Sequence, residues 1–158
     1  MSNNYYNNKV QEIAPQYLSL SFEQVHGHWA HYLPAILEKP NSTILDVGAG
    51  VGRDVSHIAK MIAASNKVEN ATRVYAVEPA SEMLKVGQSI TAKQNVHWIQ
   101  DSLPALEKTI RLEISFDLIL LSAVWMHIPN SQRARALRKL ANMLKPGGKI
   151  IISLKFGM

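Results

Sequence analysis

The sequence predicts a single α/β domain: an open, mostly parallel twisted sheet with helices on both faces. Short runs of apolar, often β-branched residues alternate along the chain with longer stretches of helical periodicity, which is the pattern of βαβ units. The chain has 158 residues, of which 47% are hydrophobic and 18% charged. This size and composition are those of one ordinary globular domain with a real core.

Five segments are expected to be strands, because each is short and apolar enough to be buried on both faces of a parallel sheet. These segments are residues 43–47, 73–77, 96–100, 116–121 and 149–154. Helices are expected between them, where apolar residues recur at a spacing of three and four. These helices are residues 53–64, 81–90 and 131–144.

The ends of two helices can also be predicted. Asn130 or Ser131 is expected to cap the last helix, which should stop before a turn at residues 146–148, the sequence Pro-Gly-Gly. Residues 22–37 are expected to form a helix that is interrupted or ended near Pro34. Residues 1–38 together would form an N-terminal helical cap on the domain, which is expected to span residues 1–158.

Composition excludes several classes of site. The chain has no cysteine, so disulfides, cysteine zinc sites and thiol nucleophiles are impossible. The N-terminus has no signal pattern, and no apolar run approaches the ~20 residues that a membrane helix needs. We therefore expect a cytoplasmic protein without a membrane partner.

A glycine-rich loop follows the first predicted strand. The sequence ILDVGAGVGRD at residues 44–54 runs from strand to helix through Gly48, Gly50 and Gly52. Glycine permits positive φ and close approach of a ligand to the backbone, and the following helix offers unpaired N–H groups. A tight turn alone would also use glycine. The spacing GxGxG after Asp46 differs from the GxGxxG of dinucleotide-binding loops and argues against NAD.

The acid-x-GxGxG loop resembles the first motif of the class I (Rossmann-like) S-adenosylmethionine-dependent methyltransferases, and further signals follow in that family's order. Glu78 and Pro79 end the second strand in VYAVEPA, and Asp101 ends the third in VHWIQDSLPAL. Ser122 ends the fourth strand, and LKPGG precedes the fifth. The resemblance covers roughly residues 25–157. It implies the family fold, S-adenosyl-L-methionine as cofactor and S-adenosyl-L-homocysteine as its product.

The resemblance also implies roles for individual residues. Glu78 would accept hydrogen bonds from both ribose hydroxyls, and Met83 would pack on the adenine, although core packing is the alternative for this methionine. Asp101 would help to recognise the adenine or cap a helix beginning near Leu103, and these two roles are compatible. The expected cofactor-binding residues are Asp46, Gly48, Ala49, Gly50, Arg53, Glu78, Pro79, Met83, Asp101, Ser102, Leu103 and Ser122.

Methyl transfer from a sulfonium mainly requires alignment of a nucleophile and exclusion of water. His127 in WMHIP is the candidate general base, because its ordinary pKa lies near neutrality. It could instead bond the backbone or bridge to the cofactor. Arg53 is a cation in the first turn of a helix, where the helix dipole disfavours it, and this favours a role in pairing with the cofactor's carboxylate.

The N-terminal segment carries tyrosine, tryptophan and three closely spaced histidines. His26 and His28 point to opposite sides of a helix, and no acidic residue completes a ligand set with His31, so no metal is expected. The expected role of the segment is a cap over the cofactor, with Tyr6 and Trp29 as candidate contacts.

Partners follow from charge and from the end of the sequence. The net charge is +5, and much of the basic excess follows residue 130, but no interleaved aromatics or nucleic-acid-binding module accompany it. A small-molecule substrate is therefore expected rather than nucleic acid, with a nucleic-acid methyltransferase as an alternative. The family's sixth and seventh strands are missing after residue 154, which would leave the fifth strand as a bare edge. A homo-oligomer could cover that edge. The alternative function is that of a domain that binds the cofactor but is catalytically incompetent.

Overall fold

The computed structural model describes residues 21–65 and 72–154. Its strands are β1 (Thr43–Val47), β2 (Arg73–Val77), β3 (Val96–Ile99), β4 (Phe116–Ser122) and β5 (Leu144–Ser153). Its α-helices are α2 (Phe22–His26), α3 (Leu33–Glu38), α4 (Arg53–Ala64), α5 (Ser81–Ile90), α6 (Glu107–Arg111) and α7 (Asn130–Asn142). Two short 3-10 helices, η1 (Ala30–Tyr32) and η2 (Trp125–His127), complete the described elements.

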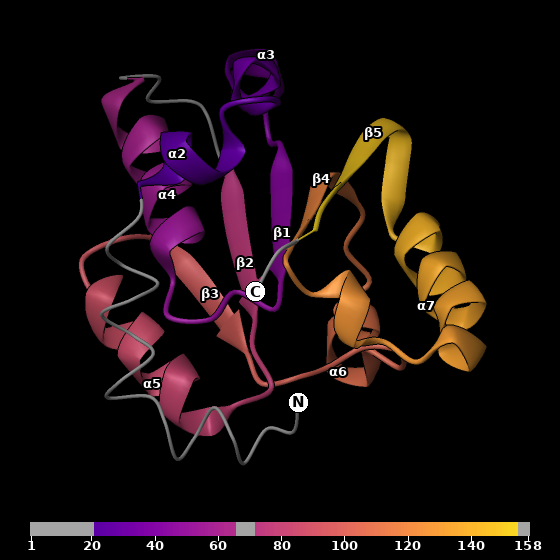
Figure 1. The fold of residues 1–158 in the computed structure, drawn as a ribbon. Helices are drawn as coiled ribbons and strands as arrows, with labels where there is room; N and C mark the ends of the chain where they lie inside the picture. The colour runs from indigo at the N-terminus through magenta and orange to yellow at the C-terminus, as the bar shows by residue number, and fades with distance from the viewer. Residues whose placement is uncertain (1–20, 66–71, 155–158) are drawn as a thin grey trace.

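The five strands form one parallel sheet in the order β3-β2-β1-β4-β5. Helices cover both faces of this sheet (Figure 1). Ile44 and Leu118 belong to the core cluster shared with α2, α3 and α4, whereas Leu45 and Ile119 belong to the cluster shared with Leu106 before α6 and with α7. The sequence prediction of an open parallel α/β sheet is therefore confirmed. Strand order reverses at β1 and β4, and ligands of open α/β sheets bind at such a switch point.

The N-terminal segment differs from its prediction. The expected helix over residues 22–37 is already interrupted at Gly27, which follows α2. The chain then passes through η1 before α3 begins at Leu33. Pro34 lies in the first turn of α3. The backbone N–H groups of a first turn make no hydrogen bond within the helix, so the lack of an N–H in proline costs nothing there. Proline therefore starts a helix here instead of ending one.

Strand β5 also begins earlier than predicted. Leu144 already pairs with Phe116, and the ladder resumes only where Lys149 pairs with Leu118. The expected turn at residues 146–148 is therefore a bulge within β5, with Gly147 at a φ of +80°. Helix α7 begins at Asn130 after Pro129, and neither Asn130 nor Ser131 caps it with a side chain. Proline, which fixes φ, supplies the start of the helix instead.

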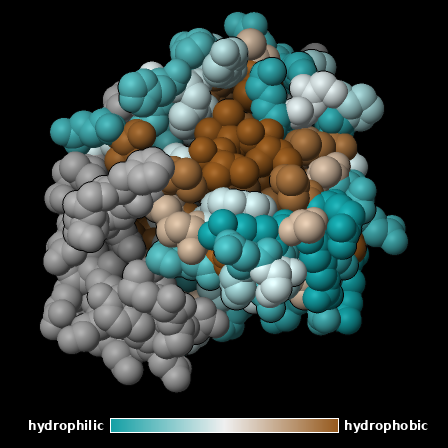
Figure 2. Space-filling model, turned by 45° about the vertical axis from the view of Figure 1, so that its right-hand side comes forward, coloured by the Kyte–Doolittle hydropathy of each residue, from teal (hydrophilic) through white to brown (hydrophobic). Residues whose placement is uncertain are grey.

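One side of the described molecule is apolar at its surface. Figure 2 shows a continuous hydrophobic area on the side that carries β5 and α7 in Figure 1. The exposed large apolar side chains include Ile152 and Leu154, at 38% and 47% of their full exposure, and Leu137 on α7. Among the described strands, β5 pairs only with β4. Within residues 21–65 and 72–154, no helix is both long and apolar enough to cross a bilayer.

Candidate functional site

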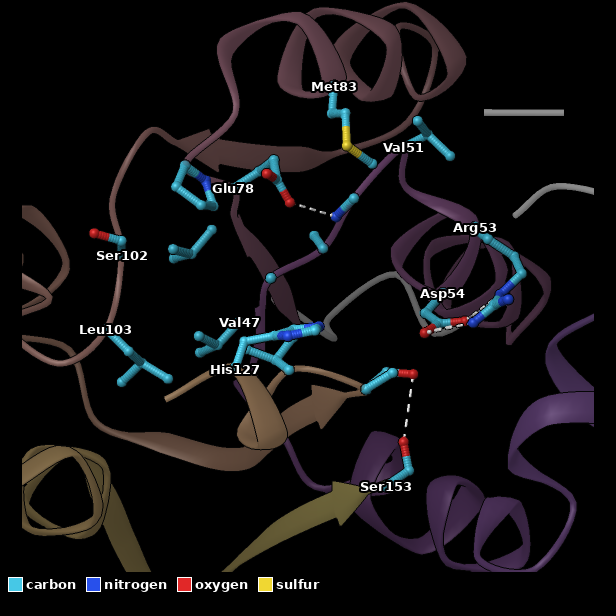
Figure 3. A pocket seen from close by; sticks show the side chains of 18 of the residues that line it. Val47, Val51, Arg53, Asp54, Glu78, Met83, Ser102, Leu103, His127 and Ser153 are labelled. Carbon is cyan, nitrogen blue, oxygen red and sulfur yellow. Dashed lines mark hydrogen bonds and ion pairs between the residues drawn. The ribbon is translucent and has the colours of Figure 1, made fainter. Parts of the chain in front are cut away.

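A cavity of about 440 Å³ lies at the carboxyl ends of the strands (Figure 3). The cavity is lined by the glycine loop after β1, by the ends of β2, β4 and β5, and by the segment after β3. The predicted site residues that line it are Gly48, Ala49, Gly50, Arg53, Glu78, Pro79, Met83, Asp101, Ser102, Leu103, Ser122 and His127. Its volume lies within the range of small-molecule and cofactor sites.

The glycine loop folds back on β2 and presents its backbone to the cavity. The N–H groups of Gly48 and Ala49 both donate to the carbonyl of Val77, at 2.8 Å each. Gly48 has a φ of +76°, and a Cβ at this position would overlap the Val124 side chain. Gly50 has a φ of +60°. The loop conformation therefore depends on glycine both for its backbone angles and for the close approach of the segment after β4.

Glu78 lies opposite the glycine loop at the end of β2. Its Oε1 accepts from the Gly50 N–H and its Oε2 accepts from the Ala80 N–H, each at 2.8 Å. The side chain is only 5% exposed. Burial raises the pKa of Glu78 to about 7, although the two backbone hydrogen bonds oppose that shift. The carboxyl group is thus fixed in orientation and ready to ionise when a ligand offers further hydrogen-bond donors.

Asp46 was predicted to bind the cofactor, but it does not line the cavity. It is buried beneath the loop, and its Oδ1 has no hydrogen-bond partner among the described residues. Burial raises the pKa of Asp46 well above its usual range, and the nearby Asp54 adds to this effect. A buried acceptor without a partner is costly. A positively charged ligand group near this carboxyl group would favour its ionised form and be stabilised by it.

Asp101, at the end of β3, organises the segment that follows. Its Oδ2 accepts from the backbone N–H and the hydroxyl of Thr109, and its Oδ1 accepts from the Ser102 N–H. The predicted helix near Leu103 begins only at Glu107. The N–H of Thr109, in the first turn of this helix, thus finds its acceptor in Asp101 and not in the side chain of the N-cap residue, Leu106. This contact holds Ser102 and Leu103 at the wall of the cavity.

An ion pair forms the wall at the start of α4. Arg53 Nε donates to Asp54 Oδ1 at 2.8 Å, and Arg53 Nη2 donates to Asp54 Oδ2 at 3.3 Å. Burial by itself raises the pKa of Asp54, but hydrogen bonds from His26 and Arg53 bring the pKa of this carboxyl below its ordinary value. The two charges form a positive and negative pair at the same wall (Figure 3).

Another part of the wall comes from β4, β5 and η2. Ser153 Oγ lies 3.4 Å from Ser122 Oγ, and both residues line the cavity near His127 (Figure 3). Partial burial lowers the pKa of His127 below its ordinary value, so its imidazole is neutral at pH 7 and able to accept a proton. Arg133 on α7 steadies this segment, because its Nε donates to the Ile128 carbonyl at 3.0 Å.

Other residues at this site were missed or misplaced by the sequence. Trp29, predicted to contact the cofactor, lies in the core at 9% exposure, and Val25 lines the cavity in its place. The missed wall residues also include Val124 and Asp54. Asp54 adjoins the predicted Arg53, and this proximity was the signal that could have found it. Tyr6 lies outside the described residues. Within residues 21–65 and 72–154, no three His, Asp or Glu side chains gather as metal ligands would.

The match to a known family covers well over half of the chain. Residues 44–148 fit the family model described as a methyltransferase domain, so the chain belongs to this family. Phosphoethanolamine N-methyltransferase 2 of Caenorhabditis elegans is 27% identical over 121 residues, covering 73% of this chain and 24% of that protein. An uncharacterized methyltransferase of Bacillus cereus is 24% identical over 135 residues, covering 85% and 57% respectively. The chain thus spans about a quarter of one relative and a little over half of the other.

Solved structures share the fold at low identity. A putative protein-L-isoaspartate O-methyltransferase of Plasmodium falciparum, in complex with S-adenosyl-L-homocysteine, has a TM-score of 0.59 and 21% identity, over 80% of this chain and 57% of that one. The complex of DhpI with S-adenosyl-L-homocysteine (SAH) has a TM-score of 0.62 and 17% identity, over 95% and 65%. These likenesses place the described sheet among methyltransferase folds.

Proposed function

We propose that this chain binds S-adenosylmethionine in the cavity at the strand ends and transfers its methyl group to a small molecule. The hydrogen bond between the Gly50 N–H and Glu78 carries this proposal, because it joins the glycine loop of β1 to the carboxyl group of β2. Such a carboxyl group, with one lone pair of each oxygen still available, is suited to a ribose with two neighbouring hydroxyls. Family membership and the SAH complexes of similar folds support the same cofactor.

The residues around Glu78 fit the rest of such a cofactor. Met83 and Pro79 offer apolar contact for an adenine beside the ribose, with Ser102 and Leu103 on the next segment. The loop backbone of Gly48, Ala49 and Gly50 would lie along the middle of the cofactor. The Arg53–Asp54 pair would face the zwitterionic amino-acid end, with the guanidinium on its carboxylate. The family resemblance and the partnerless Asp46 oxygen favour a ligand that carries positive charge, whereas the Arg53–Asp54 pair, with one charge of each sign, fits a zwitterion.

The cofactor, when bound, supplies a methyl group on a sulfonium, and the protein's residues have to prepare the acceptor. Glu78 and the Arg53–Asp54 pair would hold the cofactor, whose methyl carbon would pass to the acceptor as the bond to sulfur breaks and the sulfur becomes the neutral thioether of SAH. An amine or hydroxyl acceptor loses a proton in this transfer, and His127, which lines the cavity, would take it. Ser122 also lines the cavity, and its hydroxyl, 3.4 Å from that of Ser153, would be able to orient the cofactor or the acceptor.

The activity is tested by SAH release from S-adenosylmethionine with a panel of small amines, phenols, carboxylates and thiols. We expect turnover with one acceptor class. His127→Asn should then lower kcat by about 10²–10⁴-fold with unchanged SAH affinity. An unchanged kcat would remove His127 as the base. The absence of turnover with the whole panel, together with SAH binding, would favour a domain that binds the cofactor without catalysis.

SAH affinity should depend on pH through Glu78. The pKa of this carboxyl group is about 7 without ligand, whereas ribose hydroxyls donate to its ionised form and lower that pKa. In the free protein, the contribution of Glu78 to stability is therefore full below its unfolded pKa and lost as pH rises through about 7. The affinity for SAH changes with pH in the opposite direction, because the bound ribose favours the ionised carboxylate. Affinity should rise about tenfold from pH 6 towards pH 8 and then level off.

Calorimetric titration between pH 6 and 8.5, in buffers of different ionisation enthalpy, checks this expectation. Proton release should accompany binding near pH 7. The matched variant Glu78→Gln cannot titrate and should bind more weakly but with a flatter pH profile. A wild-type affinity that does not change over this range would show that Glu78 is not the acceptor of the ribose.

A further inference from the structure

A line of buried hydrogen bonds connects α2 to the first turn of α4. The indole Nε1 of Trp29 donates to His26 Nδ1 at 3.0 Å, and His26 Nε2 lies 2.9 Å from Asp54 Oδ2. His26 and Asp54 are 28 positions apart in the chain. The His26 side chain is fully buried, and Asp54 is 5% exposed. Two segments that precede and follow β1 in the sequence are thus joined through polar groups inside one core cluster.

The chemistry of these groups fixes the direction of each bond. An indole N–H can only donate, so His26 Nδ1 has to accept and carries no proton. The proton of the neutral imidazole is then on Nε2, which donates to the Asp54 carboxylate. The contact is therefore a hydrogen bond from a neutral histidine to a charged acceptor. Such bonds are among the stronger ones in proteins, and the loss of one leaves a buried carboxylate underpaired.

This line of bonds ends at the wall of the cavity. Asp54 and Arg53 line the cavity, whereas His26 and Trp29 lie behind them in the core. Figure 3 shows Arg53 and Asp54 paired on one side of the pocket, away from Glu78 and Met83. The adenosine half and the amino-acid half of the proposed cofactor would therefore meet different walls, and His26 supports only the second.

We infer that His26 is a positioning residue for the amino-acid half of the cofactor, acting through Asp54 and Arg53. The inference rests on the proposed function. His26 holds one oxygen of Asp54, Asp54 orients the guanidinium of Arg53, and the pair then presents both charges to a zwitterion. Binding of that zwitterion is coupled in turn to the docking of α2 on α4, because linkage between two sites is reciprocal.

Two ligands separate this role from a general structural one. SAH carries the amino-acid half, whereas 5′-methylthioadenosine has the same adenosine and thioether without it. We expect His26→Leu to weaken SAH binding about tenfold to a hundredfold and to leave the affinity for 5′-methylthioadenosine within about twofold. His26→Gln retains an N–H donor near the position of Nε2 and should recover most of the SAH affinity. Calorimetry of each variant with each ligand gives all of these values.

Trp29→Phe provides a second, milder variant, since it keeps an aromatic ring in the core and removes only the indole N–H. It should weaken SAH by a few-fold and leave 5′-methylthioadenosine unchanged. Equal loss of both ligands in these variants, or no loss of SAH in His26→Leu, would overturn the inference while the proposed function stands. A wild-type chain that binds neither ligand would overturn the proposed function itself, and the inference with it.

Discussion

Replacement of Glu78 by alanine is expected to weaken SAH binding by a hundredfold or more. The carboxyl group holds the Gly50 and Ala80 N–H groups at 2.8 Å and is proposed to accept both ribose hydroxyls. Each hydrogen bond to a charged acceptor contributes about 1.5–3 kcal/mol. Alanine removes the acceptor, and it also leaves two backbone donors at the cavity without their partner.

The matched variant Glu78→Gln separates charge from shape. Glutamine has the same length and keeps one oxygen acceptor, so its loss in SAH affinity should be smaller than that of alanine. Circular dichroism and thermal unfolding of both variants check that the fold is retained. If Glu78→Ala bound SAH as tightly as the wild type does, the ribose would not lie at this carboxyl group.

The second large effect is expected from Gly50→Val. Gly50 has a φ of +60°, a conformation that costs a β-branched residue more than most others. A Cβ at this position would lie 3.5 Å from Met83 Cε, within the cradle proposed for the cofactor. Valine should therefore shift the loop, disturb the Gly50–Glu78 hydrogen bond and fill space that the ligand needs. We expect at least a hundredfold loss of SAH affinity by calorimetry.

Gly147 offers a matched control within the same chain. Its φ of +80° is also left-handed, and a Cβ there would meet no heavy atom within 4 Å. Gly147→Val should therefore lower thermal stability through backbone strain without a direct effect on SAH binding. If both valine variants lost SAH affinity equally, the effect of Gly50→Val would come from general destabilisation instead of the cradle.

The sheet and its crossovers could be predicted because local pattern and tertiary environment agree there. The bounds of β1, β2, α4 and α5 match the prediction, since each strand is an apolar run buried on both faces and each helix starts just after a turn. Where the prediction failed, a contact distant in sequence decides. Leu144 continues as strand because Phe116 pairs with it. Trp29 turns to the core because it belongs to the buried cluster that includes Val55 and Ile58 of α4.

The candidate site was predictable to the extent that the ends of parallel strands meet. Residues at the ends of β1, β2, β3 and β4 were expected together, and the cavity joins them. The contacts that hold these residues in place from behind the cavity wall could not be predicted. The bond from His26 to Asp54 spans 28 positions, and the segment around Val124 approaches Gly48 only in the folded chain. No periodicity or motif in a single sequence encodes such contacts.

Titration of the wild-type chain with SAH, with NAD as the comparison ligand, tests the central claim most directly. The claim is that the glycine loop and Glu78 form a site for S-adenosylmethionine. Isothermal calorimetry at pH 8 should give one SAH per chain with saturable heat, and no heat with NAD. Saturable NAD binding, or no heat with SAH, would contradict the claim.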